Sequence, residues 1–321
     1  MTTLAATSLA RRDELRISLG NGAESIPGLA VLAGSGVEEL FGPAVPAGRC
    51  GPLSLRRAGD WLLGAATVPA TTGLEENAGR IYDAIFQATE GCYLARIWNY
   101  VPAINETGPG GLENYRIFCR GRSLAFERRF GAGFNAALPA ASAVGGGPGA
   151  LTVIFAASRL APQHVENPLQ VAAYHYPVEF GPRPPSFARA TIVPGLSGAT
   201  VFISGTAAIR GHATVAPLSL GRQLDCTLVN LGGIARACGL GPNLDQHGRS
   251  TRHFKVYLRH AADQPRVAAL LAERLVVDTD RVTYLRADLC RAPLCVEIEA
   301  SLFGVKLSRP RRARPRATLR G

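Results

Sequence analysis

Apolar residues recur at strand and helix spacing along most of the chain. In its first half, two short apolar runs are separated by Arg57-Ala-Gly-Asp60, which is typical of a β-hairpin. Thr72-Gly-Leu-Glu75 then has the spacing of a capping box, and the apolar positions that follow share one helical face. The elements expected here are a hairpin at 53–55 and 61–68, a helix from 72 to 90, a strand at 93–101 and a helix at 110–126.

The second half continues in the same manner after a stretch at 131–149 that is rich in Gly, Ala and Pro and predicts a loop or domain boundary. The elements expected beyond it are strands at 151–157, 171–180 and 199–209, a helix at 218–240, a strand at 253–258, a helix at 263–275, and strands at 282–289 and 294–302.

The order strand, loop, helix, strand, helix occurs twice, which predicts a duplicated α+β unit. Leu62-Leu-Gly-Ala-Ala-Thr-Val68 and Val201-Phe-Ile-Ser-Gly-Thr-Ala207 begin the two copies. We therefore expect an α+β fold of two units, each a mixed sheet with helices packed on one face, and an active site in a cleft. The expected division is 1–149 for the first domain, 150–306 for the second, catalytic domain, and 307–321 for a disordered basic tail.

Composition and charge narrow the class of protein. The 321 residues are 47% hydrophobic and 18% charged, which suits a globular protein with ample core. No apolar run is long enough to span a bilayer, and the N-terminus lacks the apolar core of a signal peptide, so we expect a cytoplasmic protein without membrane contact. Six arginines after residue 308 supply much of the net charge of +11, so a solvated tail is favoured over a nucleic-acid-binding arm.

The cysteines and histidines indicate no metal site. The seven cysteines are scattered without a CxxC pair, which favours free thiols over zinc ligands or a disulfide framework. The six histidines form no HxxxH or HExxH pattern. We expect no metal and no other cofactor.

The segment 294–300 (LCVEIEA) alternates apolar and polar positions and predicts a strand with Glu297 and Glu299 on one face. That face is either the solvated side of an edge strand or the wall of a pocket, and the pattern is compatible with both. If it lines a pocket, one of the two glutamates is the best acid/base candidate in the chain.

Four other segments gather polar, aromatic or small residues, and each also has a purely structural interpretation as core strand, solvated helix, stiff connection or turn. They are 96–105 (RIWNYVPAIN), 113–122 (ENYRIFCRGR), 174–190 and 204–212 (SGTAAIRGH). Together they supply arginines and tyrosines but no nucleophile with a paired base and no phosphate-binding loop. Such a set suits a small dianion clamped by arginines, on which one glutamate moves protons.

In these segments the chain resembles the chorismatase family, whose members act on chorismate and share a RidA-like (YjgF-like) architecture. The matching motifs are RIWNYVPAIN (96–105), ENYRIFCRGR (113–122), ENPLQVAAYHYPVEFGPRPPSFARA (166–190), FISGTAAIRGH (202–212) and LCVEIEA (294–300). They occur in the family's order over roughly residues 90 to 303. The first sixty residues and the basic tail are not covered.

The resemblance implies roles for five residues. Glu297 matches the family's catalytic acid/base, which protonates the enolpyruvyl methylene of chorismate. Tyr115, Arg122, Tyr176 and Arg189 match the substrate-binding tyrosines and arginines. It also implies a monomeric enzyme of secondary metabolism, such as antibiotic biosynthesis, that needs no cofactor.

The family divides by product, and the resemblance leaves both branches open. One branch makes 3-hydroxybenzoate plus pyruvate. The other hydrolyses chorismate to 3,4-dihydroxycyclohexa-1,5-diene carboxylate plus pyruvate. Cys290, seven positions before Glu297, resembles the 3-hydroxybenzoate branch, whereas Ala207 and Ala208 leave the hydrolytic branch open. We favour the 3-hydroxybenzoate branch, with a chorismate hydrolase as the alternative and a non-catalytic RidA-like small-molecule binding protein as the alternative of another class.

Overall fold

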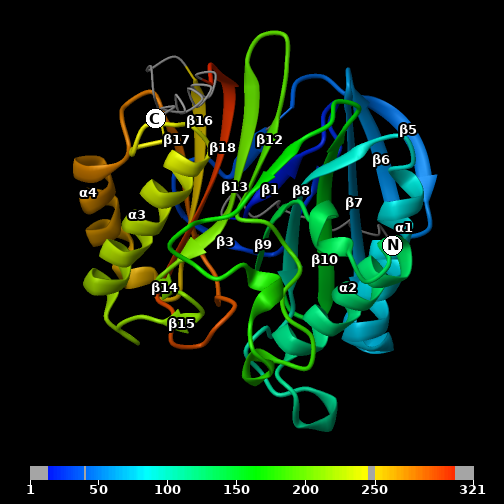
Figure 1. Cartoon of the computed structure of the whole chain (residues 1–321), viewed down its shortest axis with the longest axis horizontal. Coiled ribbons are helices and arrows are strands. Elements are labelled where there is room, and N and C mark those ends of the chain that lie inside the picture. Colours follow the sequence, from blue (N-terminus) through cyan, green and yellow to red (C-terminus); the bar gives the residue numbers. More distant parts are fainter. Residues whose placement is uncertain (1–13, 40, 245–249, 308–321) are drawn as a thin grey trace, which may run out of the picture.

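The chain folds into two sheets that face each other, with a pair of helices covering the outer face of each (Figure 1). The structure, a computed structural model, describes residues 14–39, 41–244 and 250–307. The predicted basic tail therefore lies outside the described residues, apart from its first position. The predicted α+β fold of two units with mixed sheets is confirmed.

The first sheet has six strands, and helices α1 (Leu74–Ala88) and α2 (Asn114–Phe130) pack on it. In sheet order the strands are β5 (Val45–Cys50), β6 (Leu53–Ala58), β7 (Trp61–Pro69), β10 (Ala150–Ser158), β8 (Tyr93–Val101) and β9 (Ala140–Gly145). Neighbouring strands are antiparallel except β8 and β9, which are parallel.

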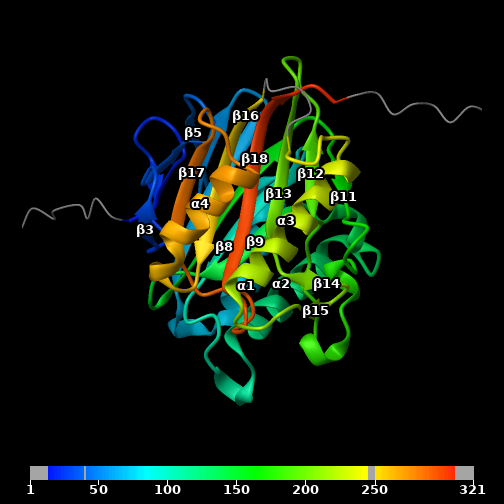
Figure 2. The same ribbon diagram turned by 90° about the vertical axis from the view of Figure 1, so that its left-hand side faces the viewer.

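The second sheet has seven strands, and helices α3 (Leu220–Ala237) and α4 (Gln264–Arg274) lie in front of it in Figure 2. In sheet order the strands are β11 (Gln163–Val165), β12 (Ala190–Val193), β13 (Ala199–Ala207), β18 (Val296–Val305), β16 (Thr251–Leu258), β17 (Arg281–Arg286) and β3 (Ala30–Ala33). Among the described residues of this sheet, only β16 and β17 form a parallel pair.

Both sheets follow the same plan. If the strands of each unit are counted along the chain, the sheet order is first, second, third, sixth, fourth, fifth in both, and the one parallel pair occupies the same place. Strand β10 is therefore the counterpart of β18, and β8 is the counterpart of β16. The repeated unit predicted from the sequence is confirmed, and β3 is an added edge strand.

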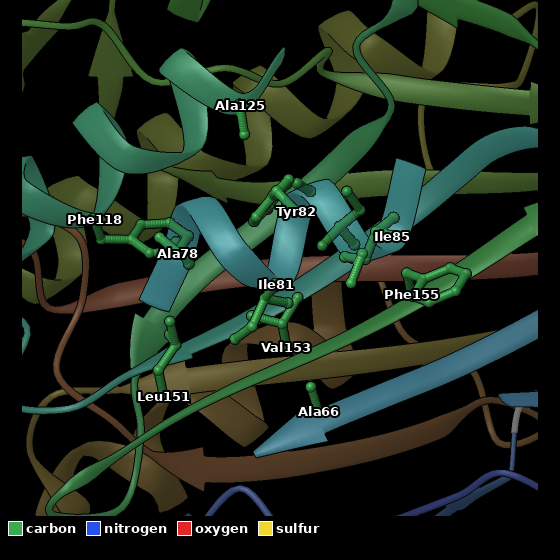
Figure 3. Close-up of a cluster of buried hydrophobic side chains, with 14 of the residues drawn as sticks. Ala66, Ala78, Ile81, Tyr82, Ile85, Phe118, Ala125, Leu151, Val153 and Phe155 are labelled. Atoms are coloured by element: carbon green, nitrogen blue, oxygen red, sulfur yellow. The ribbon is translucent and has the colours of Figure 1, made fainter. Parts of the chain in front are cut away.

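Three clusters of buried apolar side chains hold the layers together. Ile81 and Ile85 of α1 point onto Val153 and Phe155 of β10, and Figure 3 shows this contact. A corresponding cluster joins α3 and α4 to the second sheet. The third cluster lies between the sheets and includes residues of both, so the inner faces are a shared core. Burial of this apolar area supplies the main driving force for joining the units.

Several smaller elements complete the structure. A short sheet contains β1 (Arg16–Ser18), β2 (Glu24–Ser25) and β4 (Val37–Glu39), and a hairpin contains β14 (Ile209–Arg210) and β15 (Ala213–Thr214). Short 3₁₀ turns are η1 (Ala70–Thr72), η2 (Pro109–Gly111), η3 (Phe134–Ala137), η4 (Ala173–His175), η5 (Val178–Phe180) and η6 (Ala261–Asp263).

The structure corrects four sequence-based expectations. The segment 171–180 forms η4 and η5 rather than a strand, because Pro177 interrupts it. The loop expected at 131–149 contains β9. The N-cap of α1 is Gly73, without a side-chain cap, so the capping box is wrong. Strand 150–158 belongs to the first sheet, where it pairs with β7 and β8, so the proposed domain boundary at 149 separates strands of one sheet.

Candidate active site

A cavity of about 400 Å³ lies where the two units meet. The first unit contributes the start of α2, and the second contributes β13, β18, the connection before β12 and the segment before β18. Six of the eight site residues expected from the sequence line it: Tyr115, Tyr176, Arg189, Ala207, Cys290 and Glu297. Side chains from five separate segments thus converge on one space, which is the arrangement typical of a small-molecule site.

Glu297 is held rigidly in the wall of this cavity. Its strand β18 is paired on both sides, with Ala207 opposite in β13 and Tyr257 opposite in β16, and only 3% of Glu297 is exposed. Burial raises the pKa of its carboxyl group to about 8, and the negative charge of Glu299 adds to that rise. Glu297 is therefore protonated at neutral pH and can act as a general acid.

Cys290 accompanies Glu297 in the wall. Its Sγ lies 3.8 Å from Oε2 of Glu297, with the thiol as donor. Burial raises the pKa of the Cys290 thiol well above its usual value, and the carboxyl group of Glu297 raises it further. Cys290 is therefore a neutral, weakly polar neighbour of the acid rather than a thiolate nucleophile.

Two arginines face the cavity from the second unit. Arg189 donates from Nη2 to Tyr176 Oη at 2.8 Å and to the carbonyl oxygen of Val171 at 3.0 Å. The first of these hydrogen bonds fixes the side chains of Arg189 and Tyr176 relative to each other. Arg291 lies over the ring of Phe180, with 4.2 Å between the guanidinium carbon and the ring centroid, and donates to the carbonyl oxygen of His212 at 2.7 Å. Both guanidinium groups are positioned for an anionic ligand.

Arg189 forms a long ion pair with the carboxylate of Glu166. Nε of Arg189 lies 4.0 Å from Oε2 of Glu166, and burial raises the pKa of Glu166 to about 7. Because that carboxyl group is only partly ionised at neutral pH, it leaves much of the charge of Arg189 available to a ligand.

The first unit closes the cavity with the start of α2. Tyr115 lines it, and burial raises the pKa of its phenol well above the usual value, so the hydroxyl group stays a neutral hydrogen-bonding group. Glu113 and Arg116 line the same side, and Arg116 Nε lies 3.5 Å from Glu113 Oε2.

Two predicted site residues do not reach the cavity. Arg122 is two turns along α2 from Tyr115 and only 1% exposed; its guanidinium carbon lies 5.0 Å from the ring centroid of Phe118. Ala208 is fully buried behind Ala207. Seven-residue spacing on a helix places two side chains on the same face but at different depths, which explains why Tyr115 lines the cavity and Arg122 does not.

Glu299 is the second carboxylate of β18, and four donors surround it. Oε2 accepts from Arg96 Nη2 at 2.7 Å and from Ser142 Oγ at 2.5 Å. Oε1 accepts from Trp98 Nε1 at 2.8 Å and pairs with Lys255 Nζ at 2.9 Å. Burial alone would raise the pKa of Glu299, but Lys255 and Arg96 outweigh it and lower the pKa to about 2. The two glutamates of one strand are thus held in opposite charge states.

The Gly-rich segment of the SGTA motif also lies in the wall, but not as an anion site. Ser204 and Gly205 together stand opposite Glu299, because the pairing of β13 with β18 shifts between Ile203 and Thr206. The N–H of Gly205 is donated to Ser142 Oγ at 2.9 Å, so it is not free for a ligand.

Sequence reasoning missed three features of this site. Arg291 directly follows Cys290, and Phe180 lies in the quoted 166–190 motif, so position next to assigned residues was the available signal. The donors around Glu299 come from β8, β9 and β16, and only the packing of the two sheets brings them together.

Among the residues that the structure describes, no group of three or more His, Cys, Asp or Glu side chains is arranged to hold a metal ion. All seven cysteines are free thiols. None of the helices in the described part of the chain has the length and apolar character needed to cross a membrane.

Comparison with known proteins identifies the family of this chain. Residues 41–157 match the family model of the N-terminal part of FkbO/Hyg5-like chorismatases. A 3-hydroxybenzoate synthase of Streptomyces hygroscopicus is 38% identical over 256 residues, which cover 75% of this chain and 73% of that protein. A chorismatase of Streptomyces rapamycinicus is 39% identical over 257 residues, covering 76% and 75%.

A solved structure is similar over nearly the whole chain. The crystal structure of a chorismatase has 33% sequence identity and a TM-score of 0.75, over 92% of this chain and 95% of that one. The fold and the cavity thus define a two-unit α+β protein with a buried glutamic acid in a cleft. At this level of identity and coverage, the chain belongs to the chorismatase family.

Proposed function

We propose that this protein is a chorismate-converting enzyme that forms 3-hydroxybenzoate plus pyruvate, with Glu297 as the general acid/base. The observation that carries the proposal is a carboxyl group, 3% exposed and with a pKa of about 8, in the wall of a cavity that Arg116, Arg189 and Arg291 also line. Family membership supplies the substrate class, since the relatives are named chorismatase and 3-hydroxybenzoate synthase.

The charges of the cavity suit the substrate. Chorismate carries a ring carboxylate and an enolpyruvyl carboxylate, and Arg189 and Arg291 offer one guanidinium group to each. Tyr115 and Tyr176 add neutral hydroxyl groups beside them. Arg122 is buried and does not line the cavity. Its role in binding, which the family resemblance implies, stays a prediction. That role would rest on the electrostatic attraction of its positive charge for an anionic substrate.

Glu297 performs the proton transfers. Its carboxyl group donates a proton to the terminal methylene carbon of the enol ether, and the electron pair of that double bond forms the new C–H bond. The neighbouring carbon becomes oxocarbenium-like, and the carboxylate just formed at Glu297 stabilises it. The oxygen of the C4 hydroxyl group bonds to C3 as the C3–O bond breaks and pyruvate leaves, and the proton of that hydroxyl group passes to the Glu297 carboxylate. The C4–O bond then breaks, so the oxygen stays at C3; C3 gives up its hydrogen as a proton, the oxygen is protonated, and the ring becomes aromatic.

The surroundings of Glu297 favour this product. 3-Hydroxybenzoate and pyruvate together contain all atoms of chorismate, whereas the dihydroxy acid requires one added water. Cys290 fills the space beside Oε2 of Glu297 with a weakly polar group, at the position that resembles the 3-hydroxybenzoate branch. Ala207, which also lines the cavity, is the observation that supports the alternative of a chorismate hydrolase.

One experiment separates these possibilities. The purified protein is incubated with chorismate, and the products are separated by chromatography against authentic standards. 3-Hydroxybenzoate with an equal amount of pyruvate supports the proposal, and the dihydroxy acid with pyruvate supports the hydrolase. Tight binding of chorismate without pyruvate release would leave the non-catalytic binding protein as the correct description.

A further inference from the structure

Glu299 touches no part of the cavity, yet it is joined to Glu297 through two residues. Ser142 Oγ, on β9 of the first sheet, donates to Glu299 Oε2 at 2.5 Å and accepts from the backbone N–H of Gly205 at 2.9 Å. Gly205 belongs to the bulge of β13 and lines the cavity. Charge at Glu299 is thus connected by hydrogen bonds to the backbone that borders Glu297.

Gly205 sets the position of the Glu297 carboxyl group by its lack of a side chain. A Cβ atom built on Gly205 would lie 1.9 Å from Oε1 and 2.8 Å from Cδ of Glu297, and 3.2 Å from Oγ of Ser142. The carboxyl group therefore occupies the very space that a side chain at 205 would take. Any shift of this bulge moves the wall against which Glu297 rests.

The bulge is fixed from several sides. Ser204 Oγ donates to the carbonyl oxygen of Ala188 at 2.6 Å and accepts from the N–H of Ala141 at 2.9 Å. Ser142 in turn accepts from Arg96 Nη2 at 2.5 Å. With two acceptor contacts and one donated hydrogen bond, the hydroxyl group of Ser142 is fully used, which gives it one orientation.

We propose that Glu299, Ser142 and Gly205 form a positioning unit that holds the Glu297 carboxyl group at the cavity wall. The inference rests on the proposed role of Glu297 and adds residues that do not contact the substrate. It assigns Glu299 a function beyond joining the two sheets. It also explains why the bulge residue facing Glu297 is glycine, although its backbone conformation does not demand one.

The charged and titratable groups around the two glutamates come from every packed element. They are Arg96 and Tyr100 of β8, Lys255 and Tyr257 of β16, Glu38 of β4, Cys290 before β18, and Arg189 before β12. Removing the charge of Glu299 lowers the pKa of Glu297, because Glu299 is a like charge and Arg96 then acts on Glu297 unopposed.

The sharpest test moves the Glu297 carboxyl group without replacing it. In G205A the added methyl group displaces the carboxyl group, and we expect kcat for chorismate to fall at least about 100-fold with KM changed little. In S142A, where Gly205 loses its acceptor, we expect kcat to fall roughly 10-fold. S301A, the next position along the same face of β18, is the matched control and should retain the kinetics and pH profile of the unmodified protein.

E299Q tests the charge. We expect the alkaline limb of the pH profile of kcat/KM to move down by about one pH unit or more, so that activity lost at pH 7.5 returns in acid. If E299Q does not fold, the kinetics of G205A and S142A test the positioning role without it. Unchanged kcat in both would overturn the positioning role, as would an E299Q profile that superimposes on that of the unmodified protein.

A second readout separates failure of this inference from failure of the proposed function. The protonated Glu297 carboxyl group gives a C=O stretching band in infrared spectra, identified by subtraction of the E297Q spectrum, and its titration needs no substrate. A titration midpoint that shifts in S142A, a substitution that changes no charge, supports the unit even if chorismate is not turned over. An unmoved midpoint argues against it even in an active enzyme.

Discussion

Strands β10 and β18 occupy the same place in their sheets, yet only β18 carries carboxylates. Each lies between the third and fourth strands of its unit and is antiparallel to both. The inner face of β10 presents Thr152, Ile154 and Ala156, and that of β18 presents Glu297, Glu299 and Ser301. The two strands thus have the same place in the topology, but the inner face of β10 is mainly apolar and that of β18 carries carboxyl groups.

The partners of each face account for this difference. Ile154 and Ala156 meet the apolar cluster between the sheets, where an unpaired charge would be costly. Glu299 meets Arg96 and Lys255, one from each sheet, and Glu297 meets the cavity. A buried strand therefore accepts carboxylates where the opposite layer supplies cations or where the group can stay neutral.

Among the substitutions that test this difference between β10 and β18, replacement of Glu297 should have the largest effect on activity. E297Q keeps the shape of the side chain but has no proton to donate, so we expect kcat/KM for chorismate to fall about 10³-fold, within the range for loss of a general acid. The measurement is pyruvate release under initial-rate conditions. The exposed Glu179 of η5 provides the control variant E179Q, which should match the unmodified protein.

Unchanged turnover in E297Q would show that β18 differs from β10 in composition but not in function. It would remove Glu297 from the mechanism and leave the cavity without an assigned acid.

The pH dependence of stability should distinguish the two glutamates of β18 themselves. The folded pKa of Glu297 is raised to about 8, so the stability it permits is full below its ordinary pKa of 4.5 and is lost as the pH rises through 8. E297Q, which cannot ionise, should therefore unfold at the same denaturant concentration as the unmodified protein near pH 4.5 and be more stable by roughly 2–5 kcal/mol at pH 9.

Glu299 should show the opposite trend. The pKa of Glu299 in the folded protein is lowered to about 2. Its contribution to the free energy of unfolding is therefore full above pH 4.5 and is lost as the pH falls from 4.5 through 2. Urea titrations from pH 3 to pH 9 measure both effects. If the E297Q curve ran parallel to that of the unmodified protein at all pH values, the raised pKa of Glu297 would be wrong.

A smaller effect is expected at Cys290, in the loop before β18. C290V places a branched apolar group against Glu297 Oε2 and removes the thiol donor. We expect the ratio of dihydroxy acid to 3-hydroxybenzoate to rise several-fold while total pyruvate release falls by less than about 10-fold. Chromatography of both acids against pyruvate measures the ratio. The same ratio in C290V and the unmodified protein would exclude Cys290 as the selector of product.

The fold was more predictable than the environment of the site. Periodicity located α1, β8 and β18 within a few residues, because each has a regular apolar face. It placed β10 in the wrong unit, because an apolar run gives no information on which strands it pairs with. Family motifs pointed to Glu297 and Arg189, whereas the depth of Arg122 and the donors around Glu299 depend on how two distant sheets pack.

The smallest effect is expected on β10, where Thr152 is a polar side chain of the inner face. Its Oγ1 lies 3.0 Å from Oγ1 of Thr67 on β7, a hydrogen bond between neighbouring strands. T152V keeps the shape and removes that bond, so we expect a loss of about 1 kcal/mol in unfolding free energy and kcat/KM within about two-fold of the unmodified protein. A large loss of activity without loss of stability would mean that β10 also serves the site, and that the two strands differ less in function than in residue type.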